Sequence, residues 1–320
     1  YEQFTKNLLD DLQEAEDLFE GNDPICHYSI EKLNSPSSFM EDTYWGYRQM
    51  RMNYYAVCAT KARLYLWLGN KTEALKYAKK VMSDYYNGNI LEGCGVKGII
   101  TGPNTIIHSS RIQGFYKNKD NEGKKMYRLG NSDDCARKDY TLSCEHIFNM
   151  YVKDLGTTPL ATARGYQKTK SQLTSQLYGS GSTDIRLNLM WDYVYDDYWW
   201  TYYNYFKKYL QSDNMPTLAK NVLPLIRLYE MYLIAMECAS LEEANNLYSE
   251  MCVARDIPAV EIDDINELKE ILVKEYNKEF CGEGQTFYMF KRLGIETIPY
   301  AAEPGGISTY VIPLPVQETI

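Results

Sequence analysis

Two segments in the C-terminal part of the chain place charged residues on helix faces that have to be buried. The first, PLIRLYEMYLIAMECA at Pro224–Ala239, reads as an amphipathic helix because its apolar side chains recur at three- and four-residue spacing. Arg227 and Glu230 lie beside this apolar stripe. Because a buried charge is destabilising unless it is paired, both residues need partners from elsewhere in the chain.

The second segment, EFCGEGQTFYMFKRLG at Glu279–Gly294, carries charges that could serve as those partners. Gly282 and Gly284 allow a sharp turn in its middle, since glycine adopts positive φ angles without a steric penalty. Acidic residues approach this turn and basic residues follow it: Glu275, Glu279, Glu283, Lys291 and Arg292. We therefore expect buried ion pairs and interpret the following residues as structural: Arg227, Glu230, Glu279, Glu283 and Arg292.

At these residues the chain resembles the SusD/RagB family of surface-exposed outer-membrane nutrient-binding lipoproteins. Family members end with a helix of the form PLIRLxExYLIxAE, an ExxxEFxGEGxRxxDLKR element and a tail built on PIP. The corresponding segments here are Pro224–Ala239, Glu275–Arg292 and Ile312–Pro315, while Thr183–Arg186 matches the family's D-x-R step. Further matches in the N-terminal helices extend the resemblance over most of the chain. Thr286 and Met289 depart from it, because the family usually has a basic and an acidic residue there.

The resemblance implies a function, a partner and a location. It implies a protein without catalytic activity that captures an oligosaccharide at the cell surface and passes it to a TonB-dependent transporter of the SusC class. It also implies a lipid anchor in the outer membrane, on an N-terminal cysteine. No initiator methionine, signal peptide or lipobox cysteine occurs near Tyr1, so we expect an N-terminally truncated form of such a lipoprotein. Peptide-binding, RagB-like members exist, so a peptide is the alternative ligand.

Composition is consistent with a neutral ligand. The net charge of −9 and the pI near 5.1 argue against nucleic acid, whose phosphates need a basic surface. No apolar run approaches the roughly 18–20 residues of a membrane-spanning helix. The thirty tyrosines supply rings that lie flat against the apolar face of a sugar, which favours a glycan over a peptide. The eight cysteines and three histidines show no metal-binding spacing beyond Cys144 and His146, so we expect no metal and no cofactor.

Helical patterns at both ends of the chain predict a mostly α fold. Residues 1–87 form a predicted helical scaffold, in which a helix from Tyr47 to Leu68 is followed by one that Asn70 and Glu73 would cap. Small residues let this pair approach closely, as in tetratricopeptide repeats. Residues 216–320 contain further predicted helices, one of them opened by Asp264. We expect one SusD-like domain over residues 1–320, with a tetratricopeptide-like superhelix as its scaffold.

Residues 88–215 differ in character from both ends. Their first part is rich in glycine and polar residues, which predicts long irregular loops of the kind that carry function. In the second part aromatic residues alternate from Trp191 to Tyr195, Asp196–Asp197 is a potential turn, and Tyr198–Tyr209 would return as the partner strand. We expect a small aromatic β-hairpin on the helical scaffold, with Trp191 and its alternating neighbours facing inward.

Aromatic residues in predicted loops or at the hairpin are the candidate ligand contacts: Tyr44, Trp45, Tyr116, Trp199 and Trp200. The family's binding residues lie in variable loops, so the resemblance assigns none of them. Neighbours on a strand point to opposite faces, so an extended segment from Tyr198 to Tyr205 would turn one of Trp199 and Trp200 inward and the other outward.

A glycosidase and a scaffold for protein partners are the two alternative classes of function. A glycosidase needs two carboxylates on either side of the scissile bond. The acidic pairs Asp133–Asp134, Asp196–Asp197 and Asp263–Asp264 are better explained as solvated or capping groups, and ion pairing accounts for Glu279 and Glu283. We therefore predict no catalytic residue. A tetratricopeptide scaffold for protein partners would need consecutive helix pairs, which residues 88–215 interrupt.

Overall fold

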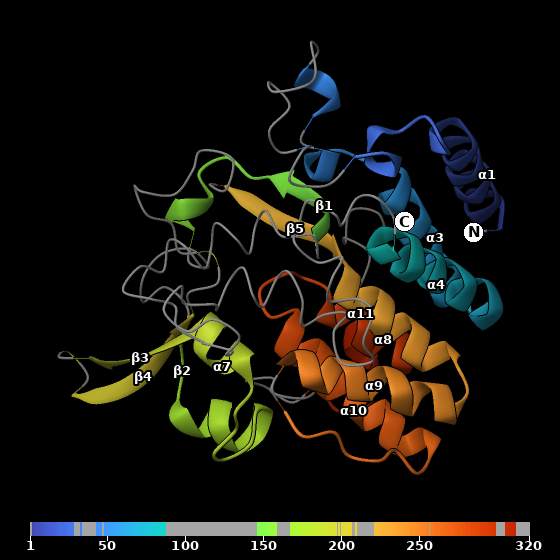
Figure 1. Cartoon of the computed structure of the whole chain (residues 1–320). Helices are drawn as coiled ribbons and strands as arrows, with labels where there is room; N and C mark the ends of the chain where they lie inside the picture. Colours follow the sequence, from blue (N-terminus) through green and yellow to red (C-terminus); the bar gives the residue numbers. More distant parts are fainter. Residues whose placement is uncertain are drawn as a thin grey trace, which may run out of the picture.

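The computed structural model describes residues 2–28, 33, 43–46, 48–87, 146–158, 167–196, 198, 200–206, 209, 221–255, 257–298 and 305–311. The fold is mostly α-helical, as predicted (Figure 1). Its helices are α1 (Glu2–Phe19), α3 (Tyr54–Trp67), α4 (Lys71–Asn87), α7 (Ile185–Met190), α8 (Leu228–Cys238), α9 (Leu241–Arg255), α10 (Ile265–Glu279) and α11 (Thr286–Leu293). Its strands are β1 (His146–Tyr151), β2 (Gln167–Lys168), β3 (Trp191–Asp196), β4 (Thr201–Phe206) and β5 (Val222–Arg227). Shorter helical segments include η3 (Thr43–Trp45) and η4 (Arg48–Met50).

Helices α3 and α4 form the predicted antiparallel pair and pack on α8. Fully buried alanines lie on both helices, including Ala59 and Ala62 on α3 and Ala78 on α4, and they allow the backbones to approach. The predicted start of α3 at Tyr47 is wrong. The helix begins after Asn53, whose side chain accepts a hydrogen bond from the amide of Ala56 at 2.9 Å and donates one to the carbonyl of Ile147 at 2.7 Å.

The segment that reads as one helix from Pro224 is half strand and half helix. Residues Val222–Arg227 form β5, which pairs antiparallel with β1, and α8 starts only at Leu228. Pro224 has no amide hydrogen and is tolerated here because, among the described residues, β1 and β5 pair only with each other, so each has an edge without a strand partner. The backbone at Arg227 is extended, with φ of −129°, so this residue ends β5 and precedes the first helical residue of α8.

The predicted hairpin is present, and β2 extends it to a three-stranded sheet in the order β2-β4-β3. Trp191 lies opposite Phe206, and Tyr195 lies opposite Tyr202. The returning strand begins at Thr201, later than predicted, because Trp200 adopts a left-handed backbone with φ of 53° and belongs to the turn. The expected alternation of Trp199 and Trp200 along an extended strand is therefore wrong for Trp200, and Trp199 lies outside the described residues.

Two hydrophobic clusters stabilise the fold. The larger cluster joins α3, α4 and the helices from α8 to α11, and the smaller one lies beneath the hairpin. Trp191 and Phe206 belong to the smaller cluster, where both are almost fully buried, so the prediction that Trp191 is a core residue is confirmed. The division of one domain into residues 1–87, 88–215 and 216–320 stays a prediction, and residues 88–145 lie outside the described part.

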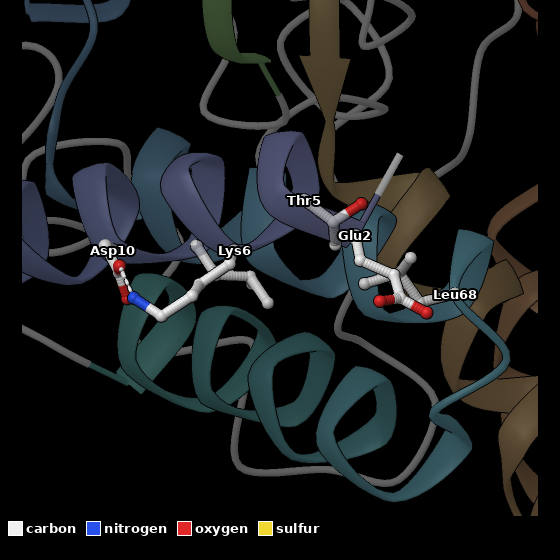
Figure 2. Close-up of a pocket in the computed structure, with 6 residues that line it drawn as sticks. Glu2, Thr5, Lys6, Asp10 and Leu68 are labelled. Atoms are coloured by element: carbon white, nitrogen blue, oxygen red, sulfur yellow. Dashed lines mark hydrogen bonds and ion pairs between the residues drawn. The ribbon is translucent and has the colours of Figure 1, made fainter.

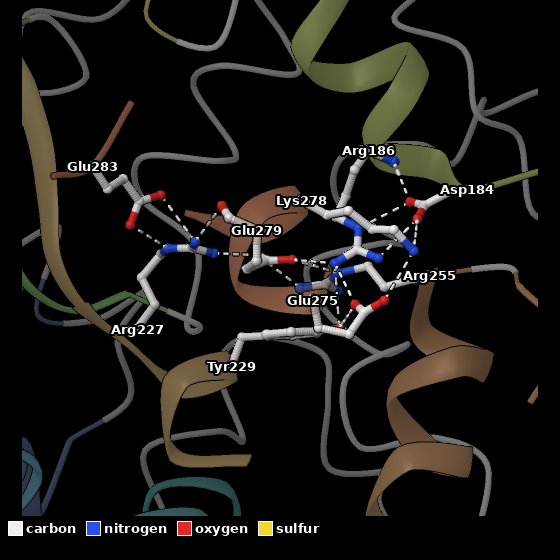
Figure 3. Close-up of polar contacts among 9 residues, drawn as sticks. All are labelled: Asp184, Arg186, Arg227, Tyr229, Arg255, Glu275, Lys278, Glu279 and Glu283. Carbon is white, nitrogen blue, oxygen red and sulfur yellow. Dashed lines mark hydrogen bonds and ion pairs between the residues drawn. The ribbon is translucent and has the colours of Figure 1, made fainter. Parts of the chain in front are cut away.

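A buried network of arginines and carboxylates joins the hairpin to the helices (Figure 3). Glu279 on α10 accepts hydrogen bonds from Arg227 of β5, from Arg255 of α9 at 3.0 and 3.1 Å, and from Arg186 of α7 at 3.2 Å. Arg227 also pairs with Glu283 at 2.9 Å. These side chains are at most 2 % exposed. The structure thus confirms that Arg227 is buried and paired with Glu279 and Glu283, while their assignment as structural residues stays a prediction.

Two of the expected ion pairs have other partners. Glu230 binds Arg63 of α3, with Nε and Nη2 each 2.6 Å from a carboxylate oxygen. Arg292 binds Glu237 of α8, with Nη2 2.8 Å from Oε2. The partner of Glu230 is therefore not Lys291 or Arg292, and the partner of Arg292 is not an acid of the Glu275–Glu283 segment. Glu230 and Glu237 are seven residues apart on α8 and share one face of it, which meets a cation from α3 and a cation from α11.

Acid should weaken the network through Glu275. Burial alone would raise the pKa of Glu275, but the charges and hydrogen bonds of Arg186 and Lys278 outweigh burial and lower the pKa from 4.5 to about 2. A carboxyl whose pKa is lower in the folded state stabilises the fold above its unfolded pKa, and this stability disappears as the pH falls toward the folded pKa. We expect the free energy of unfolding, measured by urea denaturation, to fall between about pH 4.5 and pH 2.

Substitution of Glu275 tests the source of this pH dependence. Glu275→Gln removes the titrating group, so its unfolding free energy should fall less steeply with acid than that of the wild type. Glu270, an exposed residue of the same helix, is the matched control, and Glu270→Gln should keep the wild-type slope. Equal slopes in all three proteins would show that Glu275 does not contribute to acid unfolding.

Candidate functional site

Three tyrosines form an exposed cluster on one face of the hairpin. Tyr193 and Tyr202 stack with ring centroids 4.8 Å apart and planes 17° apart, and Tyr195 meets Tyr202 edge to face at 5.0 Å. Their exposed fractions are 51 %, 51 % and 39 % for Tyr193, Tyr202 and Tyr195. They share a face with Trp191 and Phe206, because residues on one strand alternate and directly opposed residues point the same way. The face is therefore buried at its base and open toward the tip.

Two larger exposed rings follow at the turn. Tyr198 is 79 % exposed and Trp200 is 81 % exposed. A left-handed backbone is unusual for a bulky residue such as Trp200, and it costs roughly 1–3 kcal/mol. Together with the three strand tyrosines these rings form the hairpin patch: Tyr193, Tyr195, Tyr198, Trp200 and Tyr202. Flat rings that are open to solvent and fixed on a strand pair are suited to stacking against an uncharged ring-shaped ligand.

A second exposed aromatic group precedes α3. Tyr44 and Trp45 lie on η3, are 54 % and 43 % exposed, and contact each other edge to face at 5.5 Å. The guanidinium of Arg51 lies 4.3 Å from the Tyr44 ring centroid, and that of Arg48 lies 5.8 Å from the Trp45 ring centroid. Arg48 is itself held by Asp23, at 2.9 and 2.7 Å. We call Tyr44 and Trp45 the η3 patch.

The structure does not bring all predicted ligand residues together. Tyr44 and Trp45 are neighbours, but the hairpin that carries Trp200 lies well away from β1, which packs against η4 just after the η3 patch (Figure 1). Tyr116 and Trp199 lie outside the described residues. The candidate site therefore consists of two separate aromatic groups, of which the hairpin patch is the larger.

The sequence analysis did not predict that Tyr193 and Tyr195 are exposed to solvent, because it placed both against the helical scaffold. Their alternation with Trp191 was recognised, but alternation gives only the face that a residue shares. It does not say where the underlying hydrophobic cluster ends, and that cluster stops at Trp191 and Phe206. The signal in the sequence was the number of tyrosines on the two strands, which is larger than the number that the small hydrophobic cluster buries.

The described residues were compared with the requirements of a catalytic site and of a metal site. Glu279 and Glu283 both bind Arg227, and their side chains are at most 2 % exposed. Within the described ranges, no three side chains of His, Cys, Asp or Glu come together in the way a metal ion would require. No described helix is both long and apolar enough to span a membrane.

Comparison of the sequence with protein families and with curated proteins gives no match over most of the chain. No model of a protein family matches the sequence. A segment of 42 residues is 50 % identical to methionine synthase from Methanothermobacter thermautotrophicus, but it covers only 13 % of either chain and is too short to indicate a shared fold or activity.

Solved structures match over most of the chain. A SusD superfamily protein from Bacteroides vulgatus aligns with a TM-score of 0.50 and 19 % identity, over 88 % of this chain and 59 % of its own. A SusD-like carbohydrate binding protein from the same species aligns with a TM-score of 0.48 and 15 % identity, over 83 % of this chain and 50 % of its own. The chain thus spans between half and three fifths of the length of these two proteins. The first alignment and the arrangement of helices give this chain the fold of the SusD superfamily, which confirms at the level of the fold the resemblance found in its sequence.

Proposed function

We propose that this protein binds a glycan without modifying it and that the hairpin patch holds the sugar rings. The observation that carries the proposal is the exposure of five aromatic side chains on one β-hairpin whose base is buried. Exposed aromatic rings on a folded surface raise the free energy of the unliganded protein, because their apolar area stays in contact with water. A ligand with apolar faces offsets this cost when it covers the rings.

A saccharide fits the chemistry of the patch. One face of a pyranose ring consists mainly of C–H groups, which pack on an aromatic ring, while its hydroxyls point outward to the phenolic oxygens of residues such as Tyr193 and Tyr202. The stacked pair and the edge-on Tyr195 present rings in more than one orientation, so successive units of an oligosaccharide could each meet one. The acidic composition of the chain also favours an uncharged ligand over an anionic one.

The η3 patch is proposed as a further contact for the same ligand class. Trp45 offers a large flat ring, and the exposed Arg51 supplies hydrogen-bond donors for hydroxyl or ring oxygens. Arg48 is held in place by Asp23, so its position does not depend on the ligand. A peptide with aromatic or proline residues is the alternative ligand, since rings of this kind also accept such side chains.

Removal of an exposed ring should separate binding from stability. With the polysaccharide that binds best in a screen of purified polysaccharides and peptides, Trp200→Ala and Tyr202→Ala should each lower the affinity at least tenfold, or about 1.4 kcal/mol, in isothermal titration calorimetry. Because both rings are exposed, the unfolding free energy should change by no more than about 0.5 kcal/mol. The glycan should be recovered without new reducing ends.

Two controls define the outcome. Phe4→Ala removes an exposed ring from α1 and should leave the affinity unchanged. Trp191→Ala removes a buried ring and should lower the unfolding free energy by roughly 3–5 kcal/mol, as large aromatic truncations in cores do. Unchanged affinity in both Trp200→Ala and Tyr202→Ala would remove the hairpin patch from the site. Selective binding of peptides in the screen would replace the glycan with the alternative ligand.

We further propose that the full-length protein is held at the outer surface of the outer membrane by a lipid on an N-terminal cysteine and delivers its ligand to a SusC-type TonB-dependent transporter. The sequence motifs and the SusD-type fold support this assignment. Affinity purification of the tagged full-length protein from detergent-solubilised outer membranes should recover a large TonB-dependent barrel protein. Recovery of the protein in the soluble fraction, without such a partner, would contradict both the anchor and the transporter.

A further inference from the structure

A cavity in the helical scaffold has no part in the function proposed above. It has a volume of about 550 Å³, within the roughly 300–1,000 Å³ of small-molecule sites. Residues from α1, α3, α8, α10 and α11 line it, and none of the described hairpin residues does. We call it the α1–α11 cavity. On another side of α1 a second hollow is smaller, about 370 Å³, and the exposed ion pair of Lys6 with Asp10 lies along it (Figure 2).

The walls of the α1–α11 cavity are mainly apolar. Leu8 of α1, Leu64 and Trp67 of α3, Ile234 of α8 and Tyr288 of α11 contribute aliphatic and aromatic surface. Trp67 is 38 % exposed and Tyr288 is 62 % exposed, although both are large rings. When an apolar ligand covers flat apolar walls of this kind, the free energy of the complex falls in proportion to the apolar area removed from water.

The charges around the cavity are paired with one another. Arg63 makes two contacts of 2.6 Å with Glu230, and Arg292 binds Glu237 at 2.8 Å. Because each cation already faces a carboxylate of the protein, a charged ligand would lose its hydration without gaining an ion pair of its own. The lining therefore selects an uncharged ligand.

Two polar groups at the cavity retain hydrogen-bonding capacity. Arg63 uses Nε and Nη2 for Glu230, and Nη2 also donates to the carbonyl of Leu225 at 2.9 Å. Its Nη1 has no partner among the described residues, and a guanidinium offers five N–H donors in total. Gln285 donates through Nε2 to the same carbonyl at 3.4 Å, which leaves its amide oxygen without a described partner. The Nη1 donors favour a ligand with an oxygen acceptor.

We propose that the α1–α11 cavity is a second binding site, for an uncharged, flat, apolar group that carries an oxygen acceptor, such as an aromatic ring bearing a carbonyl. The ring packs against Trp67 and the aliphatic walls, and the oxygen accepts a hydrogen bond from Arg63. This site is distinct from the hairpin patch in place, because it lies among helices of the scaffold, and in chemistry, because an arginine donor stands beside its apolar walls.

Prodan, an uncharged naphthalene that carries a ketone, tests the proposal. Its fluorescence shifts to shorter wavelength in an apolar site, so titration reports affinity and stoichiometry. The wild type should bind one prodan molecule with a blue-shifted emission. Leu64→Trp fills the cavity from the partly exposed face of α3, and Trp67→Ala removes a wall. Each variant should weaken binding at least tenfold.

Thr5→Trp is the matched control, because it adds the same ring to the hollow on the other side of α1. It should bind prodan like the wild type, as should Trp200→Ala on the hairpin. Thermal melting identifies any variant that fails to fold, and Leu64→Trp decides the result if Trp67→Ala is unfolded. Non-saturable binding, or equal affinity in Leu64→Trp and Thr5→Trp, would overturn the proposal.

Discussion

The structure depends on one carboxylate that three arginines share. Glu279 binds Arg186, Arg227 and Arg255, which come from α7, β5 and α9, so a single side chain of α10 fixes three other elements. Loss of one partner from a buried ion pair typically costs about 3–5 kcal/mol, because it leaves an uncompensated charge. The interaction is therefore less a source of net stability than a constraint on how these elements can be arranged. An alternative packing would separate charges that have no access to water.

The same constraint fixes the base of the hairpin. Arg186 lies in α7, which leads directly into β3, and it pairs with Asp184 at 2.7 Å and with Glu275 at 2.8 Å. On the other strand, Phe206 packs against Gly282, where a Cβ atom would come within 3.0 Å of its ring and where φ is +76°. A strand pair held rigidly at its base presents the rings at its tip in a fixed arrangement, which reduces the entropy lost when a ligand binds.

The sequence predicted that the buried charges would be paired, but it did not predict every partner. Arg227 and Glu279 could be matched because their segments lie close together in the chain and resemble a known family. The pair of Arg63 with Glu230 joins residues 167 positions apart, and no local pattern shows that α3 packs on α8 there. The strand at Pro224 was missed for a related reason. Its partner β1 lies 70 or more residues earlier, and the apolar spacing of β5 continues without a break into α8.

The distribution of polar and apolar groups separates the scaffold from the site. Arg186, Arg227 and Arg255 are among the largest fully buried side chains of the described residues, whereas Trp200 and Tyr198 are among the most exposed large rings. The buried arginines follow from the fold, since each has its carboxylate partner. The exposed rings do not follow from burial, because most of their surface stays in contact with water. Trp200 also holds a strained backbone that glycine would adopt without cost. The exposure and the backbone strain of Trp200 support the proposal that a ligand covers its ring.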